Sequence, residues 1–91
     1  MPRPRKPRCL RFQPDVYYFK PRGIPLRILE EVQLLPEELE ALKLSEVDGL
    51  EQLIAAKRMK ISQPTFARIL SSAHQKTANA LVTGKAIRIE K

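Results

Sequence analysis

The sequence contains, from Met59 to Leu81, the stretch MKISQPTFARILSSAHQKTANAL, which has the pattern of a tight turn followed by a long amphipathic helix. Ser62 is a residue type that caps helix N-termini, and Pro64 falls in the first helical turn, where its missing N–H costs nothing. The spacing predicts a helix from Ser62 to about Val82. The side chains of its predicted packed face recur at helical spacing: Phe66, Ile69, Leu70, Ala73, Thr77 and Leu81.

The residues before this turn predict a second, shorter helix from Leu50 to Met59. Ala55 and Ala56 are small enough to let two helices cross closely. We expect the Ile61 side chain to be buried in the turn and Leu53 to pack against the longer helix. Two helices joined in this way form a helix-turn-helix, the unit that lays its second helix in the major groove of DNA. The same pattern also occurs in ordinary helical bundles.

The exposed face at the start of the longer helix carries residue types that contact DNA. Arg68 has the fork geometry that pairs with guanine, Gln63 can pair with adenine, and Thr65 is predicted to read a base or to position the helix. Predicted phosphate contacts are the hydroxyl group at the helix N-terminus and the cations that flank the motif, namely Ser62, Lys57, Arg58, Lys60 and Lys76.

The 91 residues include 17 Lys and Arg against 10 Asp and Glu, which gives a formal net charge of +7. This excess favours a polyanionic partner, nucleic acid first and an anionic membrane surface second. The charge is divided into blocks, with a net charge of +6 in residues 1–22, −5 in residues 23–50 and +6 in residues 51–91. The acidic middle block is therefore expected to face away from DNA.

Residues 1–11, MPRPRKPRCLR, are predicted to be a basic, flexible arm, because alternating proline and arginine prevents a regular helix. Its cations can enter the minor groove, as homeodomain arms do, and they are Arg3, Arg5, Lys6 and Arg8. The arrangement resembles an AT-hook but lacks the central glycine. A solvated tail with loose phosphate contacts is the alternative interpretation.

Residues 12–34 are broken by proline yet rich in apolar side chains, so we expect an extended strap that packs on the helical core. A short strand is predicted at Val16–Phe19, and Arg27–Val32 is interpreted as a helical turn or as the end of the strap. Residues 35–91 then form the helix-turn-helix domain, and arm, strap and helices together make a single domain.

The first predicted helix of that domain runs from Leu35 to Val47, with Glu40 and Lys43 on its outer face, and ends before Gly49. Lys85–Lys91 alternates like a short strand, which must pair either with Val16–Phe19 or with a second copy of the chain. The predicted fold class is mainly α: a bundle of about three helices, with a proline-rich N-terminal strap and a possible short C-terminal strand.

Catalytic signals are missing from the sequence. We find no nucleophile–base pair, no glycine-rich phosphate loop and no set of metal ligands, so we expect no enzyme activity, no cofactor and no small-molecule substrate. Cys9 is the only cysteine, which excludes an intrachain disulfide and fits a reducing compartment. No run of ~18 apolar residues and no signal-peptide core is present, which predicts a cytoplasmic protein without a membrane span.

Several segments, in order along the chain, resemble a small prokaryotic family of uncharacterised proteins that are predicted to bind DNA. They are MPRPRK, FQPDVYYFKPRGIPLRILEEVQL, ELEALKLSEVDGL, AAKRMKISQPTFARIL and ALVTGKAIRIE. The helical half, residues 35–81, is also similar to the promoter-reading helix-turn-helix of bacterial sigma factors. These resemblances imply a cytoplasmic DNA-binding protein with a regulatory role.

Matched by position, the start of the family's recognition helix falls on Ser62–Phe66, with Arg68 after it. This chain has Gln63 where the family usually has a basic residue, and Lys60 where the family usually has glycine. A lysine at that place is strained if the turn needs a positive φ. The comparison with the family also implies that Leu53 or Ile54 is exposed, which would indicate a partner surface.

The sequence therefore predicts specific binding of double-stranded DNA for transcriptional control, with a homodimer on two half-sites as a further hypothesis. One alternative is an interaction module that docks on RNA polymerase or another regulator through Leu53 and Ile54. The other alternative is non-specific binding of nucleic acid, including structured RNA.

Overall fold

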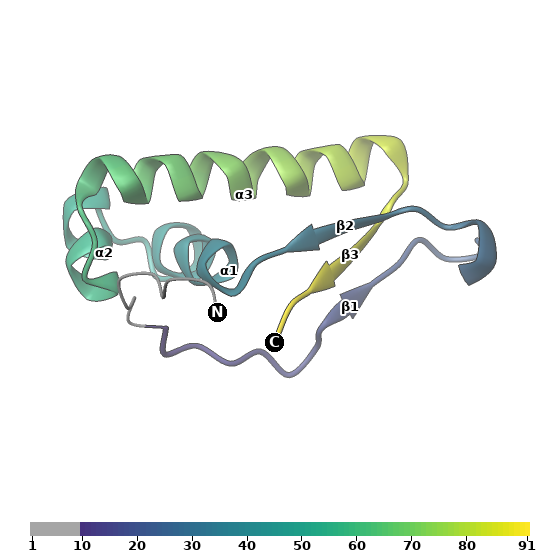
Figure 1. Cartoon of the computed structure of the whole chain (residues 1–91), viewed down its shortest axis with the longest axis horizontal. Helices are drawn as coiled ribbons and strands as arrows, with labels where there is room; N and C mark the ends of the chain where they lie inside the picture. The colour runs from purple at the N-terminus through teal and green to yellow at the C-terminus, as the bar shows by residue number, and fades with distance from the viewer. Residues whose placement is uncertain (1–9) are drawn as a thin grey trace, which may run out of the picture.

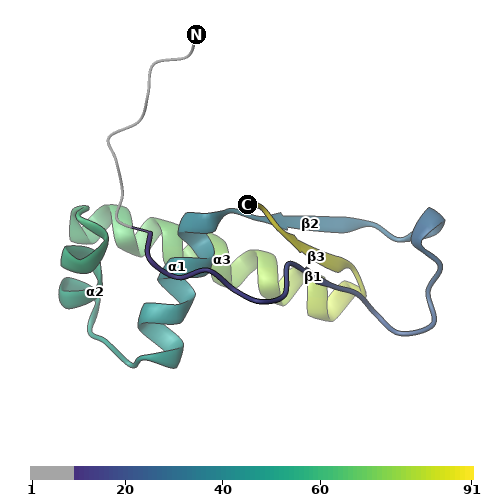
Figure 2. The ribbon, with the colours of Figure 1, turned by 90° about the horizontal axis from the view of Figure 1, so that it is seen from below.

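The computed structural model describes residues 10–91, which form a helical layer packed on a small sheet (Figures 1 and 2). The predicted class is confirmed: the fold is mainly helical and ends in a short strand. Its elements, in chain order, are β1 (Tyr18–Phe19), the 3₁₀ turn η1 (Leu26–Ile28), β2 (Glu31–Leu34), α1 (Pro36–Leu42), the π-helical segment η2 (Lys43–Val47), α2 (Gln52–Met59), α3 (Gln63–Thr83) and β3 (Ala86–Ile89).

The strand β3 lies at the centre of the sheet, in the order β1-β3-β2. It pairs antiparallel with β1, where Tyr18 lies opposite Arg88, and parallel with β2, where Leu34 lies opposite Ile89. Of the predicted partner segment, Val16–Phe19, the last two residues form the strand that pairs with β3. Because both neighbours of β3 come from the same chain, the alternative of pairing with a second copy is wrong for this strand.

The strand β2 was not predicted. The sequence interpretation of Arg27–Val32 as a helical turn or strap end holds only for the turn at Leu26–Ile28. Glu31–Leu34 instead alternates exposed and buried side chains and pairs with β3, more than 50 residues later in the chain. A strand of four residues depends on this distant partner, which local sequence patterns do not show.

The core has two hydrophobic clusters that α3 connects. One surrounds Phe66 and Met59, whose side chains are fully buried between α1, η2, α2 and α3. The other joins the sheet to α3 through Leu34, Ala73 and Ile89. Leu42 packs against both clusters, so the helices and the sheet share one continuous interior.

The predicted packed face of α3 is correct up to Ala73 and wrong at Leu81, which is 75% exposed. Ala80 is buried instead. A residue seven positions after Ala73 lies about 20° from its direction, whereas one eight positions later lies about 80° away. The helix ends at Thr83, one residue after the predicted end at about Val82, and Gly84 follows it in a left-handed conformation.

Two other sequence expectations are wrong in detail. Leu53 does not pack on α3, because α2 buries its Ala55, Ala56 and Met59 face and leaves Leu53 52% exposed. Glu40 is not on an outer face: it is buried, and its carboxylate accepts the Phe12 backbone N–H at 2.9 Å. This hydrogen bond attaches the strap to α1 at the buried side chain of Glu40.

Candidate nucleic-acid interface

A turn of three residues, Lys60–Ser62, joins α2 to α3 and sets the angle between them; we call Gln52–Thr83 the α2–α3 unit. Lys60 has φ 58° and ψ 43°, the left-handed conformation in which the sequence comparison placed glycine. Its N–H donates to the carbonyl oxygens of Ala56 and Lys57, and the N–H of Ile61 donates to Ala56 at 3.1 Å. Lys60 therefore ends α2 with the last carbonyl oxygens hydrogen-bonded, although its Cβ makes the left-handed conformation unfavourable.

Hydrogen bonds between side chains order the start of α3. The Ser62 hydroxyl caps the helix by accepting the Thr65 N–H at 3.3 Å, and it donates to Thr65 Oγ1 at 2.9 Å. Arg68 Nη2 donates to the same Thr65 oxygen at 3.4 Å. The capping residue thus fixes Thr65, and Thr65 in turn orients the Arg68 guanidinium on the outer face of the helix.

The two predicted base-reading side chains with the longest reach, Gln63 and Arg68, are exposed, and Thr65 is half-buried between them. The opposite side of the same helical turns is anchored, because Phe66 and Ile69 are buried in the core. The fold therefore presents the start of α3 to solvent on a rigid support.

Four cations of the α2–α3 unit have no negative partner among residues 10–91. Lys57, Arg58, Lys60 and Arg68 are exposed, and none of them forms an ion pair with any residue of 10–91. Unpaired charges of one sign on one end of a protein attract polyanions and raise their rate of association.

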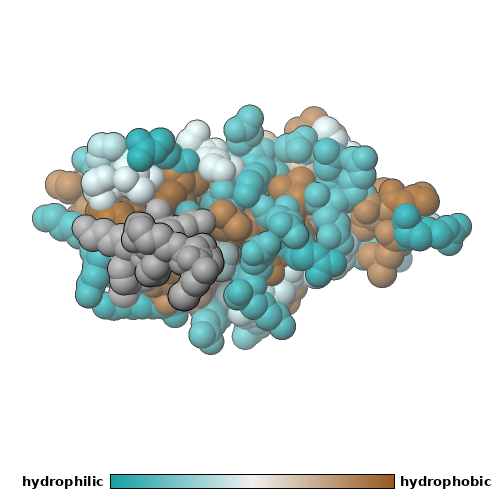
Figure 3. Space-filling model, in the orientation of Figure 1, coloured by the Kyte–Doolittle hydropathy of each residue, from teal (hydrophilic) through white to brown (hydrophobic). Residues whose placement is uncertain are grey.

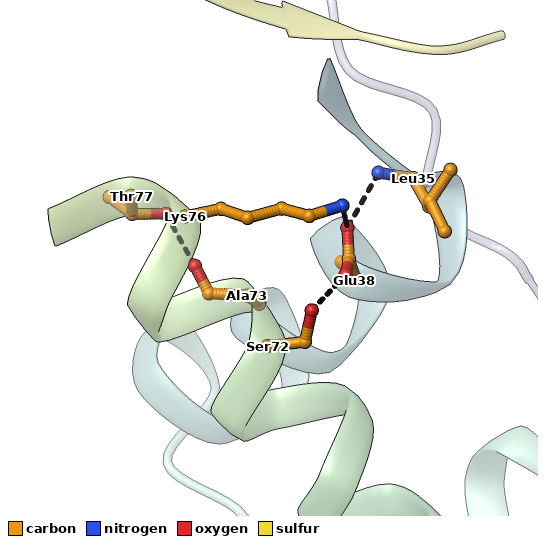
Figure 4. Close-up of polar contacts among 6 residues, drawn as sticks. All are labelled: Leu35, Glu38, Ser72, Ala73, Lys76 and Thr77. Carbon is orange, nitrogen blue, oxygen red and sulfur yellow. Dashed lines mark hydrogen bonds and ion pairs between the residues drawn. The ribbon is translucent and has the colours of Figure 1, made fainter. Parts of the chain in front are cut away.

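Lys76, predicted as a phosphate contact, has another partner: its Nζ lies 2.8 Å from Glu38 Oε1, and only 32% of its side chain is exposed (Figure 4). The same carboxylate accepts the Leu35 N–H at 2.9 Å and the Ser72 hydroxyl at 2.6 Å. We therefore assign Lys76 to the packing of α1 against α3. The sequence could not show this, because Glu38 lies 38 positions away.

Burial of Glu38 by itself raises the pKa of its carboxyl group, since it disfavours the charged form. The hydrogen bonds from Lys76, Ser72 and Leu35 outweigh that effect, and the pKa of Glu38 is lowered as a result. The carboxylate is thus charged at neutral pH and accepts from two side chains of α3 and from the N-cap residue of α1.

The remaining predicted residues lie elsewhere. The arm cations Arg3, Arg5, Lys6 and Arg8 lie outside the described residues. Sequence reasoning missed Arg11 and Lys43, which line one pocket together with Arg58. Their common location arises from the path of the strap, for which the sequence carries no local signal. Within residues 10–91 no helix is long and apolar enough to cross a membrane.

Fold and candidate interface together define a small, mainly helical protein with an exposed, positively charged helix start. The whole chain, residues 1–91, matches the family described as protein of unknown function DUF134, and the chain belongs to that family. Prokaryotic relatives called UPF0251 proteins match 99% of the chain: one from Caldanaerobacter subterraneus is 61% identical over 90 residues, which cover 76% of its own length. One from Moorella thermoacetica is 59% identical, with 60% of its length covered, and one from Dehalococcoides mccartyi is 58% identical, with 77% covered. No solved structure matches.

Proposed function

We propose that the α2–α3 unit is a helix-turn-helix that binds specific sequences of double-stranded DNA, and that the protein regulates transcription in the cytoplasm. One observation carries this proposal: the start of α3 is anchored on its inner side, exposed on its outer side and surrounded by cations without partners in residues 10–91. Neither catalysis nor a cofactor is part of the proposal.

In the proposed complex the first turns of α3 enter the major groove. Arg68 pairs with guanine and Gln63 with adenine. Thr65 holds Arg68 in place before binding, so less side-chain freedom is lost when the guanidinium meets the base.

Phosphate contacts in this proposal come from Lys57, Arg58 and Lys60 at the end of α2, and from Ser62 at the N-terminus of α3. The N-terminal arm adds sequence-independent contacts through Arg3, Arg5, Lys6 and Arg8. Binding as a homodimer would require two half-sites about one helical turn apart.

The proposal is tested by selecting bound fragments from sheared genomic DNA at near-physiological salt and sequencing them. We expect one enriched motif, and an inverted repeat of that motif would also establish the homodimer. Uniform recovery of fragments would replace specific binding by non-specific binding. A lack of recovery would remove the DNA-binding proposal altogether.

A second candidate function is docking on RNA polymerase or another regulator through α2. It is favoured by the exposed apolar side chains of Leu53 and Ile54, which are 52% and 44% exposed. The double variant Leu53→Ser, Ile54→Ser separates the two functions. Loss of polymerase binding with unchanged DNA binding would support docking, and unchanged polymerase binding would exclude it.

A further inference from the structure

A pocket of about 170 Å³ lies between the N-terminal strap and α2, outside the residues predicted to contact bases. The strap begins beside α2, at the same end of the molecule as the start of α3 (Figures 1 and 2). The N-terminal segment, α1, η2 and α2 supply the lining, which consists of Arg11, Phe12, Glu40, Lys43, Leu44 and Arg58.

The lining carries more positive than negative charge. Arg11, Lys43 and Arg58 contribute three cations, against the single carboxylate of Glu40. That carboxylate is buried and accepts the backbone N–H of Phe12 at 2.9 Å, which fixes the strap next to Arg11. Lys43 forms an ion pair with Asp48 at 2.8 Å, so it adds less charge than Arg58, which has no ion pair with residues 10–91.

Arg58 makes the pocket an extension of the α2–α3 unit. Its side chain is exposed and has no ion pair with residues 10–91, and it follows Lys57 at the end of α2 that faces the turn. The arginine directly before the strap and an arginine from α2 thus border one small cavity. Guanidinium groups suit phosphate oxygens because their donors form two parallel hydrogen bonds.

We infer that this pocket binds one phosphate of the DNA backbone, held between Arg58 of α2 and Arg11, the residue directly before the strap. The inference rests on the proposed DNA-binding function and assigns a role to the strap: it extends the contact surface beyond the recognition helix by one phosphate. Lys43 supports the site electrostatically from η2.

The first test compares the salt dependence of DNA binding for the wild-type protein, Arg11→Gln and the matched control Arg27→Gln. Arg27 is exposed on η1 and does not line the pocket, so its variant loses the same charge elsewhere. For Arg11→Gln we expect the slope of log K against log [salt] to fall by about 0.9, the value of one phosphate contact. Arg27→Gln should retain the wild-type slope, and Arg11→Lys should restore it.

The second test locates the phosphate. DNA duplexes with a single neutral methylphosphonate at successive positions should reveal one position where the wild-type protein loses about tenfold in affinity. At that position Arg11→Gln should lose nothing further, while methylphosphonates at other contacted positions weaken both proteins equally. This pattern would assign the phosphate to the pocket.

Two results would overturn the inference while leaving the proposed function intact. One is a wild-type slope for Arg11→Gln, and the other is additive losses at every methylphosphonate position. A lower unfolding temperature of Arg11→Gln combined with either result would show that Arg11 supports the fold only. If the wild-type protein binds no duplex, the proposed function itself fails, and the pocket assignment fails with it.

Discussion

Lys60 combines an unfavourable backbone conformation with a favourable charge. Its φ of 58° is costly for a residue with a Cβ, whereas glycine adopts it freely. We therefore expect Lys60→Gly to raise the free energy of unfolding by about 1 kcal/mol in urea titrations. The same variant should weaken DNA binding, with a salt slope smaller by about 0.9.

Lys57→Gly is the matched control for this prediction, since it removes the same charge from the helical interior of α2. Glycine inside a helix costs about 1 kcal/mol, so stability should change in the opposite direction while DNA binding weakens similarly. Equal destabilisation by both variants would contradict the strain assigned to Lys60.

Arg68 is the side chain with the clearest prediction for specificity. Arg68→Ala should cost ~1–3 kcal/mol of affinity for the selected DNA motif and relax the preference at one base pair. The measurement is anisotropy titration against the motif and each single-base variant of it, with Arg27→Ala as a charge-matched control. If affinity for motif and random DNA falls by the same factor, Arg68 contacts phosphate and does not read a base.

Among the elements, the sheet is held by one cluster of polar side chains on its exposed face. Arg88 of β3 donates to both carboxylate oxygens of Glu31 on β2, each at 2.9 Å, and the Tyr18 hydroxyl of β1 donates to Glu31 at 2.6 Å. The hydrogen bonds from Arg88 are the main cause, and that from Tyr18 the second, of lowering the pKa of Glu31 from 4.5 to about 2. The cluster thus links all three strands.

This pKa shift predicts how the sheet responds to acid. Because the pKa of Glu31 is lower in the folded state, its contribution to stability is complete above pH 4.5 and is lost as the pH falls toward about 2. Wild-type protein should therefore be more stable than Glu31→Gln at pH 6 in urea titrations, and the difference should shrink steadily below pH 4.5. A difference that is equally large at pH 6 and pH 2 would contradict this role of Glu31.

The ion pair between Lys76 and Glu38 joins α3 to α1. A Lys76 variant therefore tests whether this lysine stabilises the fold or contacts DNA. Lys76→Met removes one of the donors to the buried Glu38 carboxylate, and we expect a loss of about 1–2 kcal/mol in the free energy of unfolding. The salt slope of DNA binding should stay at the wild-type value. A decrease of the slope by about 0.9 would return Lys76 to the phosphate contacts.

The sequence predicted those elements whose signals are local. Ser62, Pro64 and Gly84 mark the ends of α3, and the alternation in Lys85–Lys91 marks β3. It could not predict β2, because this strand exists through parallel pairing with β3 at the other end of the chain. At the candidate interface the exposure of Gln63 and Arg68 followed from the helical period, but the partner of Lys76 and the position of Arg11 follow from tertiary packing.

On the scale of the whole molecule, the cations of α2 and the exposed apolar side chains of η1 lie at opposite ends. Lys57, Arg58 and Lys60, which form no ion pair within residues 10–91, belong to the end where α2 meets α3. Figure 3 shows hydrophobic side chains gathered over η1 at the other end, where Leu26 and Ile28 are 65% and 66% exposed. These cations attract a polyanion to the end where α2 meets α3, while the exposed Arg27 adds positive charge at the η1 end.

The two hydrophobic clusters should unfold together, because α3 runs through both and Leu42 contacts both. Ile89 is buried in the sheet cluster, so Ile89→Ala should lower the free energy of unfolding by about 2–4 kcal/mol. The exposed Leu81 provides the control, since Leu81→Ala should change the free energy of unfolding by less than about 0.5 kcal/mol.

Two probes test whether the clusters unfold together. Tyrosine fluorescence reports on the sheet through Tyr17 and Tyr18, and circular dichroism reports on the helices. Coincident midpoints that shift together in Ile89→Ala would establish one cooperative unit, in which a destabilising change in β3 also lowers the stability of the candidate interface. If fluorescence is lost before helicity, the helices form a separate unit that could bind DNA without the sheet.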